Sequence, residues 1–232
     1  MVLDDLTVVM SVYHGDSHLF LRAAIESIIN QKCLPAHFIV VADGPLNDDL
    51  ETVLSCYEKL SFVKILRLKE NRGLAVSRDL AFRQVKTPYV AVMDADDISL
   101  PERFLIQMEY IRVNECDVVG SWAEEFVSSP GDTGMVRRVP TSLSEIWSFG
   151  KWRSPCNHVT LVMRIEAYFE IGGYSKLRAS EDWELISRFL VRGKKLYNIP
   201  QTLVHFRGGD AMIQRRRSFR QINNEAFALW KM

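Results

Sequence analysis

Long apolar runs, paired cysteines and an excess of either charge are all missing from this chain of 232 residues. No apolar run approaches the roughly 18 residues that a membrane-spanning helix needs. Lys plus Arg number 29 and Asp plus Glu number 29, so the charge balance does not favour nucleic-acid binding. Residues 1–6 carry acidic groups where a signal peptide has basic ones, and we expect a cytoplasmic protein.

The few cysteines also exclude some classes of protein. They are scattered, with no CxxC pair and no zinc spacing: Cys33, Cys56, Cys116 and Cys156. Free thiols in a reducing compartment account for this pattern. Hydrophobic residues make up 47% and charged residues 25%, as in ordinary globular proteins. Without repeats or a low-complexity linker, the sequence predicts one domain over residues 1–232.

Strand and helix patterns alternate through the first half of the chain. β-branched apolar runs predict strands at 6–13, 38–42, 63–68 and 89–93. Amphipathic or helix-forming segments predict helices at 17–31, 46–59 and 73–83. This order predicts an α/β fold with a doubly wound, mostly parallel sheet flanked by helices.

The second half is less regular. It predicts helices at 101–113 and 181–192, and strands at 117–127, 159–163, 196–199 and 203–206. Residues 128–134 form a turn-rich break. We interpret residues 135–155 as a mobile loop, in which Trp147, Trp152 and Arg153 are able to contact an acceptor or to pack in the core.

Three carboxylates follow the apolar strand predicted at 89–93: Asp94, Asp96 and Asp97. The carboxyl ends of parallel strands are where open α/β sheets bind ligands. A cation would offset so much negative charge, and oxygen ligands favour Mg²⁺ or Mn²⁺. The alternative is a solvated acidic turn that precedes the helix near Pro101.

Asp43, Gly73 and Arg78 are candidates for binding a nucleotide. Asp43 also ends a predicted strand and is able to accept hydrogen bonds from a base or ribose, although Asp-Gly-Pro is by itself a turn signal. Gly73 begins a helix, where backbone N–H groups favour anions. Arg78 lies just over one turn further on and either reaches a diphosphate or is a solvated surface arginine.

Carboxylates also open the helix predicted at 181–192. Asp182 is a candidate general base. Alternatively, Glu181 and Asp182 stabilise the first turn of the helix, with Ser180 as its N-cap. His205 is a candidate metal ligand or phosphate contact, with a structural role as the alternative. Arg215–Arg217, with Arg220, form a basic cluster that contacts anionic lipid headgroups or is simply solvated.

In order and spacing, these motifs resemble the family 2 glycosyltransferases of the GT-A fold over almost the whole chain. The matching segments are 8–13 with 21–31, Asp43, 71–74 with Arg78, 94–97 and Asp182. Ser11 stands where proline is usual, and Asp79 where asparagine is common. Segments 97–104 and 157–160 resemble a branch that makes bacterial surface polysaccharides, whereas the role of His158 is left open.

The resemblance implies a role for each matching residue. Ser11, Val12 and Tyr13 begin the nucleotide site, and Asp43 holds the base. Gly73 and Arg78 lie at the phosphates, Asp94 faces the ribose, Ala95 belongs to the nucleotide site, and Asp96 binds the metal. Asp182 is the catalytic base. Residues 1–115 then form the nucleotide-sugar half and 116–232 the acceptor half.

The resemblance also implies a reaction. A sugar moves with inversion from a nucleoside diphosphate sugar, by resemblance a UDP-sugar, to a hydroxyl of a glycan or lipid-linked acceptor. Mn²⁺ or Mg²⁺ stabilises the leaving diphosphate, and any contact with the inner membrane is peripheral.

Three other functions compete with this one. A sugar-1-phosphate nucleotidyltransferase needs a Gly-rich basic loop after the first strand, and residues 11–16 do not provide one. A haloacid-dehalogenase-like phosphatase expects Thr or a similar residue where Ile98 stands. A non-catalytic nucleotide-sugar-binding subunit would have lost Asp96 or Asp182, and both are present.

Overall fold

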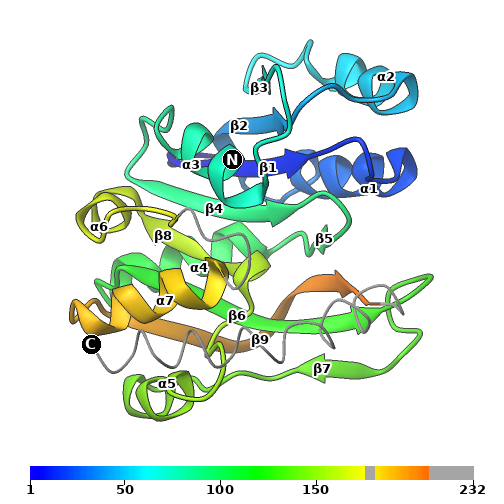
Figure 1. Ribbon diagram of the computed structural model, residues 1–232. Coiled ribbons are helices and arrows are strands. Elements are labelled where there is room, and N and C mark those ends of the chain that lie inside the picture. Colours follow the sequence, from blue (N-terminus) through cyan, green and yellow to red (C-terminus); the bar gives the residue numbers. More distant parts are fainter. Residues whose placement is uncertain (176–180, 209–232) are drawn as a thin grey trace.

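The computed structural model describes residues 1–175 and 181–208, and these contain one nine-stranded sheet (Figure 1). The strands are β1 (Val2–Val12), β2 (Leu34–Ala42), β3 (Val63–Arg67), β4 (Tyr89–Asp94), β5 (Ile98–Ser99), β6 (Val118–Phe126), β7 (Met135–Arg137), β8 (Val162–Arg164) and β9 (Leu196–Arg207). Their spatial order is β3-β2-β1-β4-β8-β6-β9-β5, and β7 pairs with the β6 strand.

The first half of the chain forms the parallel part of this sheet. β1 pairs in parallel with both β2 and β4, and β2 pairs in parallel with β3. The connecting helices are α1 (His18–Ile29), α2 (Asp48–Tyr57) and α3 (Leu74–Phe82). The predicted alternation of strands and helices is confirmed here, although β1 and β2 each begin four residues earlier than the apolar runs indicate.

The second half brings antiparallel pairing. β8 is antiparallel to both β4 and β6, whereas β9 runs parallel to β6. The two strands predicted at 196–199 and 203–206 are one strand, whose pairing with β6 is irregular between Ser121 and Ala123. The strand predicted at 159–163 is shorter, because a 3₁₀ turn, η1 (His158–Thr160), takes its first residues.

The prediction of a loop over residues 135–155 is wrong. This segment contains β7 and the helix α5 (Leu143–Gly150), which begins with a capping box. The Ser142 side chain accepts from the Glu145 backbone N–H, and the Glu145 carboxylate accepts from the Ser142 backbone N–H. These two bonds satisfy backbone donors at the helix start, which explains why a short helix forms here.

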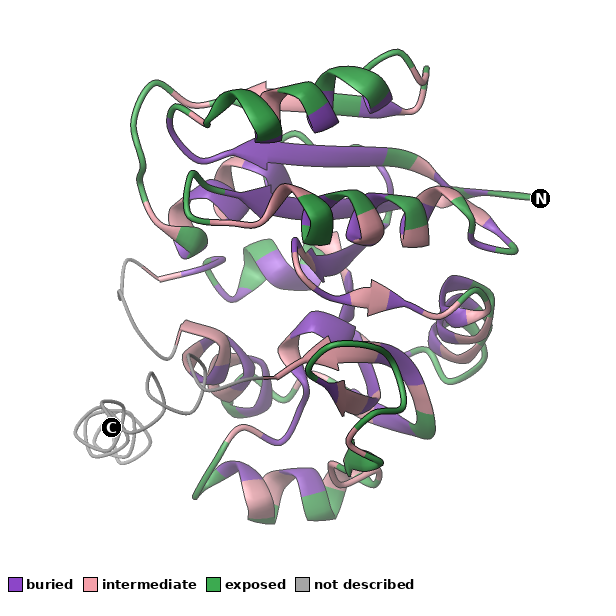
Figure 2. Cartoon of the chain, turned by 90° about the vertical axis from the view of Figure 1, so that its right-hand side faces the viewer, coloured by how far each residue is buried: buried purple, intermediate pink, exposed green. Residues whose placement is uncertain are grey.

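Helices cover both faces of the sheet, which gives two apolar cores. α1, α2 and α4 (Arg103–Val113) pack on one face, against alternate strand residues such as Val8 and Met10. α3, α5, α6 (Ile165–Glu170) and α7 (Glu181–Val191) contribute to the core on the other face, with Val9 and Val41. Figure 2 shows the buried strands between helices whose outer faces are exposed. This layering directs the carboxyl ends of β1, β2 and β4 to one edge.

Candidate functional site

The carboxyl ends of three neighbouring parallel strands bring the predicted nucleotide residues together. Ser11 in β1 pairs with Val41 in β2 and with Asp94 in β4. The hydroxyl of Ser77, in α3, donates to Ser11 Oγ at 3.1 Å, so α3 is tied to the end of β1. The strand register therefore explains how segments 11–13, 43 and 94–97 come to share one edge of the sheet.

Asp43 is buried, and its carboxylate holds the segment before α3. Oδ1 accepts from the Arg72 backbone N–H at 2.8 Å, and Oδ2 accepts from the Gly73 N–H at 2.9 Å. Gly73 has a φ of +86°, a conformation that favours glycine. The Gly73 N–H predicted to face a phosphate thus binds Asp43 instead, and the contact between Asp43 and a base stays a prediction.

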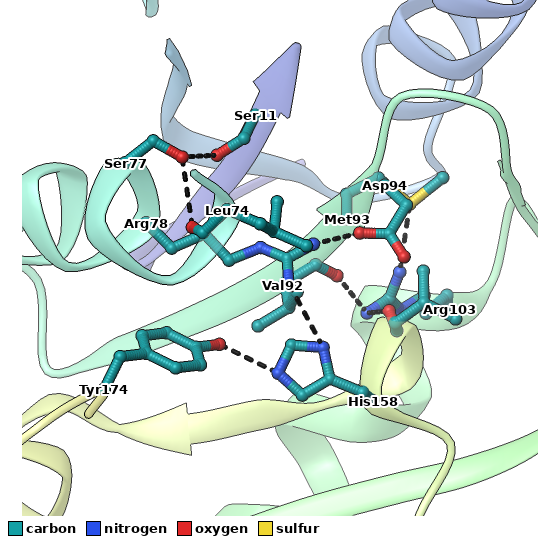
Figure 3. A network of polar contacts seen from close by, with 11 residues as sticks. Ser11, Leu74, Ser77, Arg78, Val92, Met93, Asp94, Arg103, His158 and Tyr174 are labelled. Atoms are coloured by element: carbon teal, nitrogen blue, oxygen red, sulfur yellow. Dashed lines mark hydrogen bonds and ion pairs between the residues drawn. The ribbon is translucent and has the colours of Figure 1, made fainter. Parts of the chain in front are cut away.

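Arg78 lies at the centre of the site rather than on the surface. It is 2% exposed and forms an ion pair with Asp94, which was not expected from the spacing of the two residues (Figure 3). Its Nη1 lies 3.4 Å from Nδ1 of His158 in η1. Burial opposes the charge of Arg78, but Asp94, with Glu181 and other neighbours, holds its pKa above the ordinary value.

The surroundings of His158 favour the neutral form of its imidazole. Burial and the neighbouring Arg78 charge lower its pKa well below the usual range. Nε2 of its ring lies 2.8 Å from the hydroxyl of Tyr174, a buried residue after α6. The sequence placed His158 in a motif without assigning it a role, and gave no signal for Tyr174.

The remaining carboxylates of the acidic motif differ in their surroundings. Burial, with the charges of Asp94 and Asp16, raises the pKa of Asp96 to about 6. Asp97 is fully buried, and its Oδ1 accepts from the Arg207 backbone N–H at 2.6 Å. Burial and the neighbouring carboxylates raise the pKa of Asp97 as well. Asp97 therefore ties the motif to β9, and Asp96 is the better candidate for a cation.

A divalent cation fits the surroundings of Asp96. Burial and the like charges around its carboxyl group both raise its pKa, and a cation would stabilise the ionised form. Within residues 1–175 and 181–208, however, no three His, Cys, Asp or Glu side chains are placed to bind a metal together. Oxygens of a substrate would have to complete the coordination, as is common for Mg²⁺.

His205 lies on β9 and pairs with Ile98 of β5, the residue after the acidic motif. Its Nδ1 lies 2.8 Å from Oε2 of Glu124. This contact supports the structural alternative for His205, and its role as a metal ligand stays a prediction.

Asp182 opens α7, as predicted, with Glu181 beside it. Its Oδ1 accepts from the Trp183 backbone N–H at 2.7 Å. Burial raises the pKa of Asp182, whereas Arg78 lowers it and Asp94 raises it further. Burial and Asp182 also raise the pKa of Glu181. The charges of Arg78 and Asp94 therefore both act on the pKa of the candidate base.

The other predicted nucleotide residues have mixed surroundings. Val12 is buried, and its carbonyl accepts from the Asp43 N–H at 2.7 Å, so it joins β1 to β2. Tyr13 is 44% exposed and is available to a ligand. Ala95 is buried beside Asp94. The nucleotide contacts of these residues stay predictions.

Arg103, which has no distinguishing signal in the sequence, is fully buried beneath the acidic motif. Its Nη2 donates to the carbonyls of Val92 in β4 and Val159 in η1, both at 2.9 Å. Its Nε donates to Gln107 Oε1 at 2.9 Å. Burial lowers the pKa of Arg103 to about 9. Arg103 therefore fixes η1, and with it His158, against the end of β4.

The remaining predicted residues lie outside this cluster or outside the described residues. Ser180 and Arg215–Arg217 with Arg220 lie outside the described residues. Trp152, in the segment proposed to contact an acceptor, is 72% exposed. The guanidinium of Arg153 lies 5.1 Å from the centre of the Phe149 ring. Among the described helices, none is long and apolar enough to cross a membrane.

Comparison with known sequences gives consistent matches. The model of the family described as "Glycosyl transferase family 2" matches residues 7–222. A Haemophilus influenzae protein named "Uncharacterized glycosyltransferase" is 34% identical over 97% of this chain and 83% of its own length. The Escherichia coli UDP-Gal:alpha-D-GlcNAc-diphosphoundecaprenol beta-1,3-galactosyltransferase is 31% identical over 90% of this chain and 76% of its own.

Solved structures share the fold. S. aureus TarS 1-349 in complex with UDP-GlcNAc has a TM-score of 0.71 at 16% identity, over 89% of this chain and 59% of that one. The mannosyltransferase PcManGT from Pyrobaculum calidifontis, in complex with GDP-Man and Mn²⁺, has a TM-score of 0.72 at 14% identity, over 97% and 64%. This chain spans less than two thirds of either. The predicted GT-A fold is confirmed.

Proposed function

Because this chain belongs to glycosyl transferase family 2 and is a glycosyltransferase, we propose that it transfers a sugar from a nucleoside diphosphate sugar in bacterial polysaccharide synthesis. UDP is the proposed nucleotide, and a hydroxyl of a glycan or lipid-linked sugar is the proposed acceptor. One relative's name includes UDP-Gal and diphosphoundecaprenol, and another relative's name includes amylovoran biosynthesis. Both names support this substrate class.

One observation carries the proposal: buried Arg78 forms an ion pair with Asp94 at the strand ends, and the charges of both residues act on the pKa of Asp182. A displacement at the anomeric carbon needs charge stabilisation at the leaving diphosphate and a base at the attacking hydroxyl. The strand ends supply the first and the start of α7 supplies the second.

The proposed reaction inverts the anomeric carbon in a single displacement. Asp182 takes the proton of the acceptor hydroxyl as its oxygen forms a bond to C1 of the donor sugar, and the bond from C1 to the diphosphate oxygen breaks. The Trp183 N–H, at 2.7 Å from Asp182 Oδ1, orients the carboxylate. Burial, which raises the Asp182 pKa, makes that carboxylate a stronger proton acceptor than a solvated aspartate.

Asp96 is the proposed ligand of a divalent metal, Mn²⁺ or Mg²⁺. When bound, the metal neutralises the leaving diphosphate as a Lewis acid. Arg78, held by Asp94, adds positive charge on the same side. The peripheral contact with a membrane through Arg215–Arg217 stays part of the proposal.

Paired substitutions in the first turn of α7 test the assignment of the base. We expect Asp182→Asn to lower sugar transfer about 10²–10⁴-fold, the usual contribution of a general base, and to leave UDP binding unchanged. Glu181→Gln is the matched control, because it removes the neighbouring carboxylate, and it should retain most of the activity. Transfer from UDP-galactose or UDP-N-acetylglucosamine to a diphosphoundecaprenol-linked sugar is the assay. An active Asp182→Asn enzyme would refute the assignment.

A further inference from the structure

The hydroxyl of Tyr174 is a buried hydrogen-bond donor for which the site described above has no use. The tyrosine ring packs at 5.6 Å, between ring centroids, from both Phe82 and Tyr168. The Tyr174 backbone N–H donates to the Tyr168 hydroxyl at 2.8 Å. Packing and this bond fix the position of the ring, so its hydroxyl has a defined place in the site.

The direction of the hydroxyl proton follows from the neighbouring groups. The guanidinium of Arg78 has only N–H donors, so the His158 Nδ1 that faces it at 3.4 Å must present a lone pair. A neutral imidazole then carries its proton on Nε2 and donates it to the Tyr174 oxygen at 2.8 Å. Figure 3 shows His158 between Arg78 and Tyr174. The Tyr174 proton is therefore directed away from His158.

The charged groups near the Tyr174 hydroxyl are those to which the proposed function assigns roles. Burial raises the pKa of the Tyr174 hydroxyl, and the charges of Arg78 and Asp94, and of Asp182 and Glu181, act on it as well. In the part of the chain that the structure describes, His158 is the hydrogen-bond partner of the Tyr174 hydroxyl, and no acceptor takes its proton. Among the described residues this buried donor therefore lacks an acceptor, and an oxygen of a bound ligand would supply one.

We propose that Tyr174 donates a hydrogen bond to an oxygen of the transferred sugar, and that Arg78 sets the direction of this bond through His158. The inference rests on the proposed function and deepens it, because it names a residue that recognises the sugar rather than the nucleotide. Under the proposed function the sugar lies between Arg78 at the diphosphate and the base Asp182, so a hydroxyl joined to Arg78 through His158 is suited to contact it. Tyr174 is then a contact residue and His158 a positioning residue.

Calorimetric titrations of UDP, UDP-galactose and UDP-N-acetylglucosamine, each with Mn²⁺, separate the two parts of the ligand. We expect Tyr174→Phe to bind UDP as the wild type does, and to bind the preferred UDP-sugar about three- to tenfold more weakly, as for one neutral hydrogen bond. Tyr57→Phe is the matched control, because it removes another buried tyrosine hydroxyl, one that donates to Glu26 at 2.8 Å on α1. It should leave all three affinities unchanged.

The titrations distinguish a failure of the sugar contact from a failure of the proposed function. An equal loss for UDP and the UDP-sugar, or no loss for either, would overturn the sugar contact. Failure of the wild type to bind any of the three nucleotides would instead overturn the proposed function, and this inference with it.

Two measurements test the role of His158. A His158→Ala variant should show the same selective loss, and combining it with Tyr174→Phe should add little, whereas additive losses would overturn the coupling. Nitrogen NMR of the His158 imidazole in the wild type tests the direction of these hydrogen bonds without a substitution. We expect the neutral form protonated at Nε2, and a proton on Nδ1 would contradict the proposed direction.

Discussion

Removing the carboxylate of Asp43 should destabilise the whole nucleotide half of the fold. The side chain is 4% exposed and accepts two backbone hydrogen bonds, at 2.8 and 2.9 Å, from the residues before α3. Hydrogen bonds to charged groups contribute about 1.5–3 kcal/mol each, and water that enters the space offsets part of the loss. We therefore expect Asp43→Ala to lower the free energy of unfolding by about 2–4 kcal/mol, and Asp43→Asn, which keeps one acceptor oxygen, by about 1–2 kcal/mol.

Urea denaturation followed by circular dichroism and by tryptophan fluorescence measures this change. Asn47→Ala is a matched control, because its side chain caps α2 by accepting from the Leu50 N–H at 3.0 Å, but it is exposed and uncharged. That substitution should cost about 0.5–1 kcal/mol. If Asp43→Ala unfolds within about 0.5 kcal/mol of the wild type, the carboxylate does not hold the start of α3 and the reasoning is wrong.

Further predictions concern pH and stability. A base must be ionised, so transfer should fall as the pH drops through the raised pKa of Asp182. This fall should occur at a higher pH than for an unperturbed aspartate, whose pKa is near 3.8. Asp182→Asn should abolish this dependence in the pH–rate profile. Arg103→Met leaves buried carbonyls of β4 and η1 without this donor, and should lower the free energy of unfolding in denaturant by about 2–4 kcal/mol. Each acceptor that loses its donor costs about 1–3 kcal/mol, and removal of the buried charge offsets part of that cost. Gly173→Ala would place a Cβ 2.8 Å from Asp79 Oδ1 at a φ of +71°, and a clearly lower melting temperature should result; an unchanged one would contradict the contact.

The parallel half of the fold could be predicted from sequence because its signals are local. Apolar strand runs and amphipathic helices alternate there, and the strand register that follows from them brings Ser11 and Asp94 side by side. The antiparallel half depends on pairings between distant segments, such as β8 with β4. Those pairings, rather than propensity, divide residues 158–164 into a 3₁₀ turn and a short strand.

The gathering of the candidate residues at the strand ends was predictable from the sequence, but their contacts were not. Asp43, Arg78 and Asp94 were all expected near a nucleotide, yet the structure binds them to the protein itself: Asp43 to the start of α3, and Arg78 to Asp94. His158 comes from a segment 80 residues beyond Arg78, so no spacing rule could pair them. Arg103 reads as an ordinary helical arginine until the fold buries it beneath the acidic motif.

The central claim is that the acidic motif binds a metal together with a nucleoside diphosphate, and calorimetric titration tests it most directly. UDP would be titrated with and without Mn²⁺ into the wild type, into Asp96→Ala, and into Asp49→Ala as a control at an exposed acidic residue. We expect UDP binding that needs Mn²⁺, is lost in Asp96→Ala and is kept in Asp49→Ala. Binding that is equal in all three proteins, or independent of Mn²⁺, would contradict the claim.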